Sequence, residues 1–465
     1  GPWLTAFAYG TSYFSAVVFV GYAGQFGYKY GLASTWIGIG NAVLGSLVAW
    51  VVLGRRTRIM SKHLGSMTMP DFFGKRYDSQ SLRIAASVIA FIFLIPYTAS
   101  VYNGLSYLFG MAFDVDFRIC VVVMAVLTGV YVIIGGYMAT AWNDLIQGII
   151  MLFGIVAVIA AVLSGHGGFM AAVKELAQVP SSVMPGAYAS FLGPDPANLF
   201  GVVILTSLGT WGLPQMIQKF YAIKDEKAVH TGTIISTLFA IVVSGGCHFL
   251  GGFSRISGVK EAVDGTVKYD TIIPTMLSSL PDILIGIVIV LVLSASMSTL
   301  SSLVLTSSST LTLDFIKPLF VKKMNEKQQL VWMRVLLAGF ILISVVIALD
   351  PPAFIAQLMG ISWGALAGAF LAPFLYGLYW KGVTRAAVWA SFICGVGITV
   401  ANMFFRFIAS PINAGAFAMV AGLVIVPVVS LISPKLKKET VEDVFHCLEE
   451  KVMVEQKLAL PEEEE

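Results

Sequence analysis

The chain has 465 residues, of which 57% are hydrophobic and 12% are charged, and its formal net charge is +3. Soluble domains carry about 25% charged residues, so this composition excludes a soluble enzyme, a nucleic-acid-binding protein and a disordered scaffold. At roughly 20 apolar residues per span, the length allows about twelve transmembrane helices. The composition therefore indicates an integral membrane protein.

Apolar runs that are separated by polar residues, glycine or proline predict twelve transmembrane helices. Their ranges are 3–26, 34–53, 82–110, 117–135, 141–164, 198–222, 229–252, 283–313, 329–349, 353–379, 383–405 and 411–432. No nucleotide-binding G-x-x-x-x-G-K-[S/T] sequence and no H-E-x-x-H sequence occurs in the chain. The sequence therefore predicts a membrane protein that is not an enzyme.

The basic residues are distributed unevenly between the two sides of these helices. If the segment 54–83 is cytoplasmic, then 22 of the 29 lysines and arginines lie on the cytoplasmic side and 7 on the other. Cytoplasmic loops of membrane proteins carry this excess of positive charge. The count predicts a multi-pass plasma-membrane protein whose acidic tail, 433–465, is cytoplasmic. This tail is expected to be solvated or, alternatively, to form an amphipathic helix that binds a partner.

Two of the predicted helices contain residues that interrupt a helix. Residues 10–16 read Gly-Thr-Ser-Tyr-Phe-Ser-Ala in the first helix, and residues 206–215 contain Gly212 and Pro214 in the sixth. Interrupted backbone at membrane depth is tolerated where it faces protein or a water-filled cavity. Breaks at matching places in two halves of a chain point to the binding site of a transporter. Close packing through small residues is the alternative explanation.

The eighth predicted helix carries a dense run of hydroxyl groups. Residues 294–302 read Ser-Ala-Ser-Met-Ser-Thr-Leu-Ser-Ser. Like Ca²⁺ and Mg²⁺, Na⁺ is a hard cation that takes oxygen ligands, so hydroxyls and freed carbonyls would form a sodium site of low charge. Alternatively, these hydroxyls bond to carbonyls of their own helix. Asp144 at the start of the fifth helix is either a functional acid in the membrane or a carboxylate that stabilises a helix N-terminus.

Together these motifs resemble the sodium/solute symporter family over most of residues 1–405. The resemblance is carried by residues 1–6, residues 68–77, Gly135-Gly136 before Asp144, residues 364–380 and the Met-Ser-Thr-Leu-Ser segment at 297–301. The last segment is similar to that of the proline-transporting members. Because Gly-Pro-Trp at the start resembles the opening of the family's second helix, we expect one further helix upstream.

The resemblance implies an all-α membrane fold with inverted five-helix repeats of the leucine-transporter type and two extra C-terminal helices. Residues 1–164 would form the first repeat and residues 198–379 the second. Residues 383–432 would form the two additional helices, and residues 433–465 the tail.

The resemblance also implies particular site residues. A first sodium site would use the carbonyls of Thr11, Phe14 and Ala295 and the hydroxyls of Ser298 and Thr299. A second sodium site, as in some sialic-acid transporters, would use Asp144, Ser301 and Ser302. The residues expected to bind solute are Tyr13, Ser15, Tyr97, Thr98, Trp211 and Gln215; the aromatic ones are alternatively ordinary core residues.

The predicted function is sodium-coupled uptake of a small organic solute by alternating access. The mostly neutral and aromatic candidates suit an amino acid such as proline or a small carboxylate. Proline-transporting members carry an aspartate where this chain has Tyr13, so a sugar, sialic acid or vitamin-type solute stays an alternative, as does a membrane solute sensor. The expected partners are Na⁺, the solute and the lipid bilayer, with no nucleic acid, and the protein is expected to be a monomer or a loose homo-oligomer.

Overall fold

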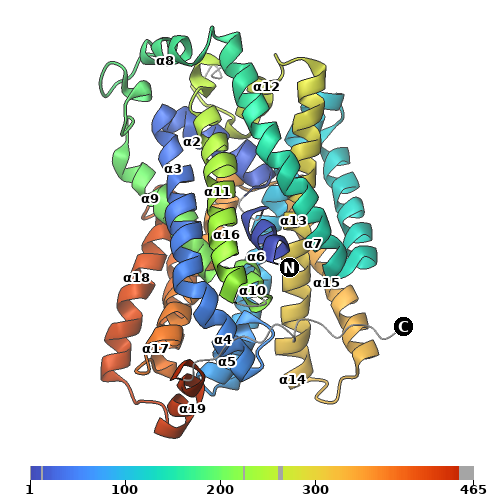
Figure 1. The fold of residues 1–465 in the computed structure, drawn as a ribbon, viewed down its shortest axis with the longest axis vertical. Coiled ribbons are helices and arrows are strands. Elements are labelled where there is room, and N and C mark those ends of the chain that lie inside the picture. The colour runs from blue at the N-terminus through green and yellow to red at the C-terminus, as the bar shows by residue number, and fades with distance from the viewer. Residues whose placement is uncertain (1, 12–13, 224–225, 260–264, 450–465) are drawn as a thin grey trace.

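The computed structural model describes residues 2–11, 14–223, 226–259 and 265–449, and within those ranges the side chains at 2, 4, 5, 134–144, 226 and 449 are not described (Figure 1). In these ranges the regular structure is entirely helical, without strands. The long helices run side by side along the longest axis of the molecule. This arrangement agrees with the predicted all-α membrane fold.

The elements include α-helices, labelled α, and 3-10 or π-helical segments, labelled η. In the first half of the chain they are α1 (Pro2–Thr11), η1 (Val17–Tyr22), α2 (Ala23–Tyr30), η2 (Gly31–Ser34), α3 (Thr35–Gly40), η3 (Asn41–Val48), η4 (Trp50–Gly54), α4 (Arg55–Leu64), α5 (Met69–Arg76), α6 (Gln80–Phe113), α7 (Phe117–Gly165), α8 (Phe169–Ala177) and η5 (Ala187–Ala189). In the second half they are α9 (Pro196–Leu208), η6 (Gly209–Gly212), α10 (Pro214–Tyr221), α11 (Glu226–Gly251), η7 (Ser254–Ile256), η8 (Tyr269–Thr271), α12 (Ile272–Leu277), α13 (Asp282–Leu311), η9 (Thr312–Ile316), α14 (Lys317–Leu319), α15 (Glu326–Leu349), α16 (Ile355–Tyr379), α17 (Arg385–Phe405), α18 (Pro411–Ile432) and α19 (Lys438–Glu449).

Within the described ranges, nine helices are long and apolar enough to cross a membrane, or ten if the bent pair α9–η6 and α10 counts as one span. The prediction of twelve spans differs from this number in three places. The first predicted helix is split, and its first part, α1, has only ten residues. The run of helical segments Val17–Leu64, which turns at Gly31 (φ 62°), holds both the second part of the first predicted helix and the whole of the second. The fourth predicted helix is present only as the shorter apolar stretch Phe117–Ile133, and α7 continues from it without the predicted gap into the span Leu145–Gly165.

Burial separates the central helices from those that face outward. In the most apolar stretch of α16, 89% of the residues are buried, against 17% in α15. Large apolar side chains such as Leu342 and Val346 of α15 are exposed. A helix that exposes so much apolar surface is stable only beside lipid or another protein. The fold therefore has α16 in its interior and α15 at its lipid-facing side.

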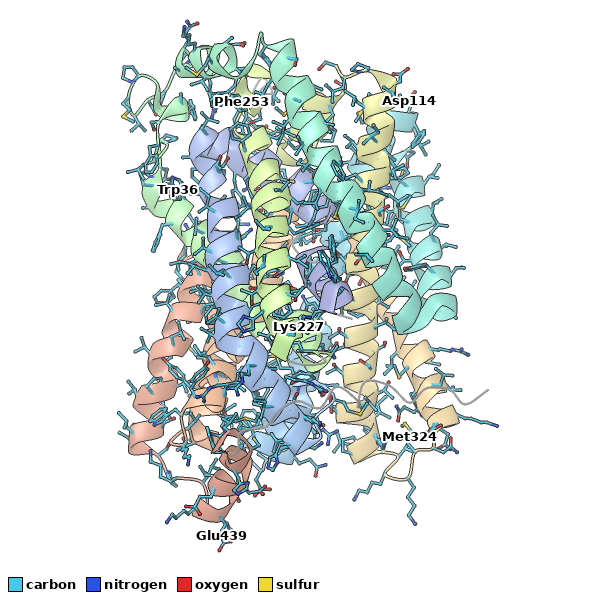
Figure 2. The ribbon with its side chains drawn as sticks, viewed as in Figure 1. Trp36, Asp114, Lys227, Phe253, Met324 and Glu439 are labelled. Atoms are coloured by element: carbon cyan, nitrogen blue, oxygen red, sulfur yellow. The ribbon has the colours of Figure 1, made fainter. Side chains whose placement is uncertain are left out.

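The molecule has two distinct ends. Figure 2 shows Met324 and Glu439 at one end and Asp114 and Phe253 at the other. Figure 1 places α4, α5 and α19 at the first of these ends and α8 and α12 at the second. We call the first the basic end, because the basic segments 54–83 and 317–334 lie there. The predicted alternation of the segments between two sides thus agrees with their arrangement in space.

A buried carboxylate anchors α13 at the basic end. The Asp314 side chain is fully buried in η9, which directly continues α13. One of its oxygens accepts a hydrogen bond from Arg83 Nε at 2.8 Å, and the other accepts one from Thr68 Oγ1 at 2.5 Å. Arg83 Nη1 also lies 3.2 Å from Oδ1 of Asp71 in α5. Because a buried charge is tolerated only when it is paired and hydrogen-bonded, these contacts fix α13 against α5 and α6.

The described part of the acidic tail packs on the rest of the chain. In α19, Val444, Phe445 and Cys447 are buried. The guanidinium of Arg76 lies 4.9 Å from the centre of the Phe445 ring, and His63 Nε2 is 2.9 Å from the Asp443 carbonyl. The expectation of a solvated tail is therefore wrong for α19. An amphipathic helix is predicted over 441–460; α19 covers its first part, with its apolar residues buried against the chain, and residues 450–460 lie outside the described residues.

Close approach of helices at glycine gives a test of this packing. A Cβ atom added to Gly27 of α2 would lie 2.0 Å from the Gly251 carbonyl oxygen of α11, whereas one added to Gly286 of α13 would meet nothing within 4 Å. We expect Gly27→Ala to destabilise the protein by about 1–3 kcal/mol or more, because the backbones must separate. Gly286→Ala should be neutral or slightly stabilising, because alanine is the better helix former.

The unfolding temperature of the two purified variants in detergent measures this difference. Equal unfolding temperatures for Gly27→Ala and Gly286→Ala would contradict the close contact between α2 and α11.

Candidate functional site

The first predicted helix is interrupted where its sequence predicts. Helix α1 ends at Thr11, Phe14 and Ser15 are not helical, and the helix resumes from Ala16 into η1. Thr11, Phe14 and Ser15 are all buried. The Phe14 N–H donates to the Thr11 carbonyl at 3.1 Å, and the Val17 N–H donates to Ser15 Oγ at 3.2 Å. Turn and cap interactions therefore satisfy part of the backbone that the break releases.

The sixth predicted helix is interrupted in the same way. It bends by 48° between η6 and α10. Leu213 at the bend has an extended backbone, and Pro214 begins α10. Proline is well suited to the first position of a helix, because its missing N–H would have no partner there. Both predicted breaks are therefore present in the structure.

The two breaks meet at one backbone carbonyl. The Gly45 carbonyl of η3 accepts a hydrogen bond from the Tyr9 hydroxyl at 3.0 Å. Thr210 Oγ1 also lies 3.4 Å from this carbonyl oxygen, while it donates to the Ser207 carbonyl of its own helix at 2.9 Å. Tyr9 lies just before the first break and Thr210 lies in η6, just before the second. The adjacent Leu44 carbonyl accepts from the indole N–H of Trp211 at 3.0 Å. The π-helical segment η3 thus holds the two interrupted helices beside each other.

Hydroxyl groups of α13 contact the first break directly. The Ala16 N–H donates to Ser296 Oγ at 2.9 Å, and Thr299 Oγ1 lies 3.5 Å from the Phe14 carbonyl oxygen. Ser296 is fully buried and Thr299 is 5% exposed. Ser296 was not among the predicted site residues, although it lies in the hydroxyl run that indicated the site. The contact shows that α13 supplies oxygen atoms to the broken backbone.

These contacts bring some of the residues predicted for the first sodium site together, and their role as sodium ligands stays a prediction. Thr299 Oγ1 lies beside the Phe14 carbonyl oxygen, and the Phe14 N–H donates a hydrogen bond to the Thr11 carbonyl within the break. Ala295 and Ser298 are buried neighbours of Ser296 and Thr299 on α13.

The residues of the predicted second sodium site are engaged elsewhere or lie outside the described part. The Ser301 hydroxyl donates to the Ser298 carbonyl of its own helix at 2.9 Å. Ser302 Oγ accepts a hydrogen bond from the Lys219 ammonium of α10 at 3.2 Å. The Asp144 side chain lies outside the described residues. Lys219 is 7% exposed, although it lies near the end of the predicted sixth helix.

The predicted solute-binding residues differ in whether their polar groups already have hydrogen-bond partners. Thr98 and Trp211 already use their polar groups, because Thr98 Oγ1 donates to the Leu94 carbonyl and Trp211 donates to Leu44. Gln215 is 6% exposed, and its Oε1 has no hydrogen-bond partner among the described residues. Ser15 caps the resumed helix, and Tyr13 lies outside the described residues.

One aromatic residue near the second break was missed. The Trp363 ring of α16 lies 5.9 Å from the Tyr97 ring of α6, centre to centre. A Cβ atom on Gly209 would lie 2.9 Å from Trp363 Cε3, so the ring also touches η6. Its buried indole N–H has no partner among the described residues. A lone tryptophan within a glycine- and alanine-rich helix carries no sequence signal that separates a binding residue from a core residue.

Two interrupted helices that are both bonded to η3, with polar groups beside the breaks, are typical of a membrane transporter of the broken-helix class. The model of the sodium:solute symporter family matches residues 1–395. The chain belongs to this family, so it is a transporter, not an enzyme, and it couples solute movement to sodium.

Relatives and solved structures agree with this assignment. The sodium/proline symporter of Staphylococcus aureus is 28% identical over 451 residues, which cover 94% of this chain and 86% of that protein. A Na⁺-coupled sialic acid symporter, solved in a substrate-bound outward-open state, aligns with a TM-score of 0.73 at 15% identity, covering 94% of this chain and 91% of the other. A nucleobase-cation-symport-1 family transporter aligns with a TM-score of 0.54 at 12% identity, covering 96% of both chains. These likenesses show the leucine-transporter type of fold.

The bond between Ser296 and the first break gives a direct test of this geometry. Ser296→Ala removes the partner that the Ala16 N–H has among the described residues. A buried N–H that loses its partner should cost about 1–3 kcal/mol. Ser308→Ala is a matched control on the same helix, because Ser308 is equally buried and its hydroxyl donates only to carbonyls of α13. Its loss should cost less, about 0.5–1.5 kcal/mol.

Thermal unfolding in detergent compares the two variants with the wild type. A Ser296→Ala protein as stable as Ser308→Ala would show that α13 does not hold the break.

Proposed function

We propose that the protein takes up a small zwitterionic amino acid, such as proline, together with Na⁺ bound between the first break and α13. The observation that carries this proposal is the 3.5 Å separation of Thr299 Oγ1 and the Phe14 carbonyl oxygen. An ordinary O–H···O hydrogen bond is shorter. For a hard cation with metal–oxygen distances of about 2.4 Å, neighbouring ligands of an octahedral set lie roughly 3.4 Å apart. The two oxygens are therefore spaced as ligands of one such ion.

The composition of this site suits an ion that must bind and leave again. Its proposed ligands are the carbonyls of Thr11, Phe14 and Ala295 and the hydroxyls of Ser298 and Thr299. All five ligands are neutral, so no fixed negative charge in this set opposes release of the cation.

The solute is proposed to bind between the two breaks. Tyr97 and Trp363 supply aromatic walls from α6 and α16. The indole N–H of Trp363 and Oε1 of Gln215 are buried polar atoms without partners among the described residues. A donor and an acceptor of this kind match the carboxylate and the amine of a zwitterion, because buried polar groups gain most from a bound partner. The sodium/proline symporter relative supports the same class of solute.

A single Na⁺ supplies enough free energy for concentrative uptake. Entry of one positive charge at 100 mV contributes about 2.3 kcal/mol, and a tenfold sodium gradient adds about 1.4 kcal/mol. Together these terms support roughly 500-fold accumulation of a neutral solute, because each 1.4 kcal/mol corresponds to a factor of ten. In this orientation the basic end is proposed to lie in the cytoplasm of a cell whose plasma membrane holds the protein.

Uptake of radiolabelled proline into proteoliposomes, with sodium or potassium outside, tests the proposal. We expect uptake to require inward sodium and to increase with an inside-negative membrane potential. Thr299→Ala and Ser298→Ala should each raise the half-saturating Na⁺ concentration about tenfold, which corresponds to about 1.4 kcal/mol for one lost ligand.

Ser344→Ala is the control for hydroxyl loss, because this buried serine of α15 bonds only to its own helix at Phe340. Proline uptake that is equal in sodium and potassium would contradict the coupling. Unchanged sodium dependence in the Ser298 and Thr299 variants would contradict the site.

A further inference from the structure

A lysine side chain reaches the hydroxyl run of α13 from the second broken helix. Lys219 is 7% exposed in α10, and its Nζ atom donates to Ser302 Oγ at 3.2 Å. A protonated lysine has three N–H donors and no acceptor, so the Ser302 oxygen must direct a lone pair toward the positive charge. This is the orientation that a serine oxygen takes toward a bound metal cation.

The neighbouring residues fix this contact in place. Gln218, the residue before Lys219, accepts a hydrogen bond through Oε1 from Thr306 Oγ1 of α13 at 2.9 Å. Ser302 and Thr306 are four residues apart, so they lie on the same face of the helix. Two adjacent residues of α10 therefore bind two hydroxyls on one face of α13. This paired contact holds the ammonium beside Ser302. Both residues of the pair lie in the short helix α10, which begins at Pro214.

Ser302 is also one of the oxygens that the family resemblance implies for a second sodium ion. Two monovalent cations at one hydroxyl oxygen repel each other, and the repulsion is stronger where burial lowers the effective dielectric constant. The second hydroxyl of that set, Ser301, donates to its own helix and points its hydrogen at the Ser298 carbonyl. Of the two described hydroxyls of this set, Ser302 therefore faces an ammonium and Ser301 faces a carbonyl of its own helix.

We propose that the Lys219 ammonium is a built-in cation that takes the place of a second sodium ion, so that the protein binds one Na⁺ per chain. This inference rests on the proposed sodium-coupled function and determines its stoichiometry. Lys219 then determines how many sodium ions are coupled to one solute molecule. It predicts that removing the positive charge frees the Ser302 side of α13 for a second Na⁺.

Equilibrium binding of radioactive ²²Na⁺ to the purified full chain tests this proposal without any solute. We expect one bound ion per chain in the wild type and in Lys219→Arg, which keeps the charge. Lys219→Met and Lys219→Gln should each bind two. Lys219→Met combined with Ser302→Ala should return to one, because the freed oxygen is then missing.

Lys227→Met is the matched control, because Lys227 is an exposed lysine of α11 outside both sites (Figure 2). It should bind one ion, as the wild type does. Two ions in the wild type would overturn the proposal, and so would a single ion in both folded neutral variants of Lys219. A failure to take up proline, with the sodium counts as expected, would instead contradict only the proposed solute.

Discussion

The structure depends on how it satisfies interrupted backbone inside an apolar helix bundle. Residues 14–15 leave the helical path in a region where lipid offers no hydrogen bonds. The Ala16 N–H finds its partner in Ser296, and the Phe14 carbonyl faces Thr299. Both partners come from α13, so this helix must stay beside the break. The ion pair of Asp314 with Arg83 serves that requirement, because it fixes the far end of α13.

The same constraint relates the two broken helices to each other. Tyr9 donates to the Gly45 carbonyl and Trp211 to the adjacent Leu44 carbonyl, so η3 bonds to residues beside both breaks. A movement of either interrupted helix changes its distance from these carbonyls. The site between them is therefore built from oxygen atoms whose positions depend on several helices at once. Such a site can respond to an ion by shifting the balance between two arrangements of the helices.

Both breaks were predictable because each has a local cause. Gly10, Gly212 and Pro214 are poor residues for the interior of an apolar helix, and the structure interrupts the helices beside them. The hydroxyl run of α13 was predictable too, because small polar residues interrupt a long apolar stretch of the sequence there. The identity of the family followed from these same segments.

Other features were beyond the reach of the sequence because they depend on tertiary contacts. Lys219 looks like one charge near the end of the predicted sixth helix, and only the packing of α10 on α13 shows that it binds Ser302. Trp363 lies near the second break because it packs against Tyr97 and Gly209, which are distant from it in the chain. The continuity of α7 is not predictable from Gly135-Gly136, because adjacent glycines are poor helix formers in isolation. The roles of Asp144 and Tyr13 stay predictions.

Sodium binding at the first break is the claim on which the account depends. Hydrogen–deuterium exchange of the purified protein in sodium, compared with potassium at equal ionic strength, measures it most directly. The account predicts that sodium slows exchange in peptides that cover the end of α1 through η1 and in peptides from the middle of α13, while α18 is unaffected. Identical exchange in both salts, or a sodium effect that leaves the break and α13 unchanged, would contradict it.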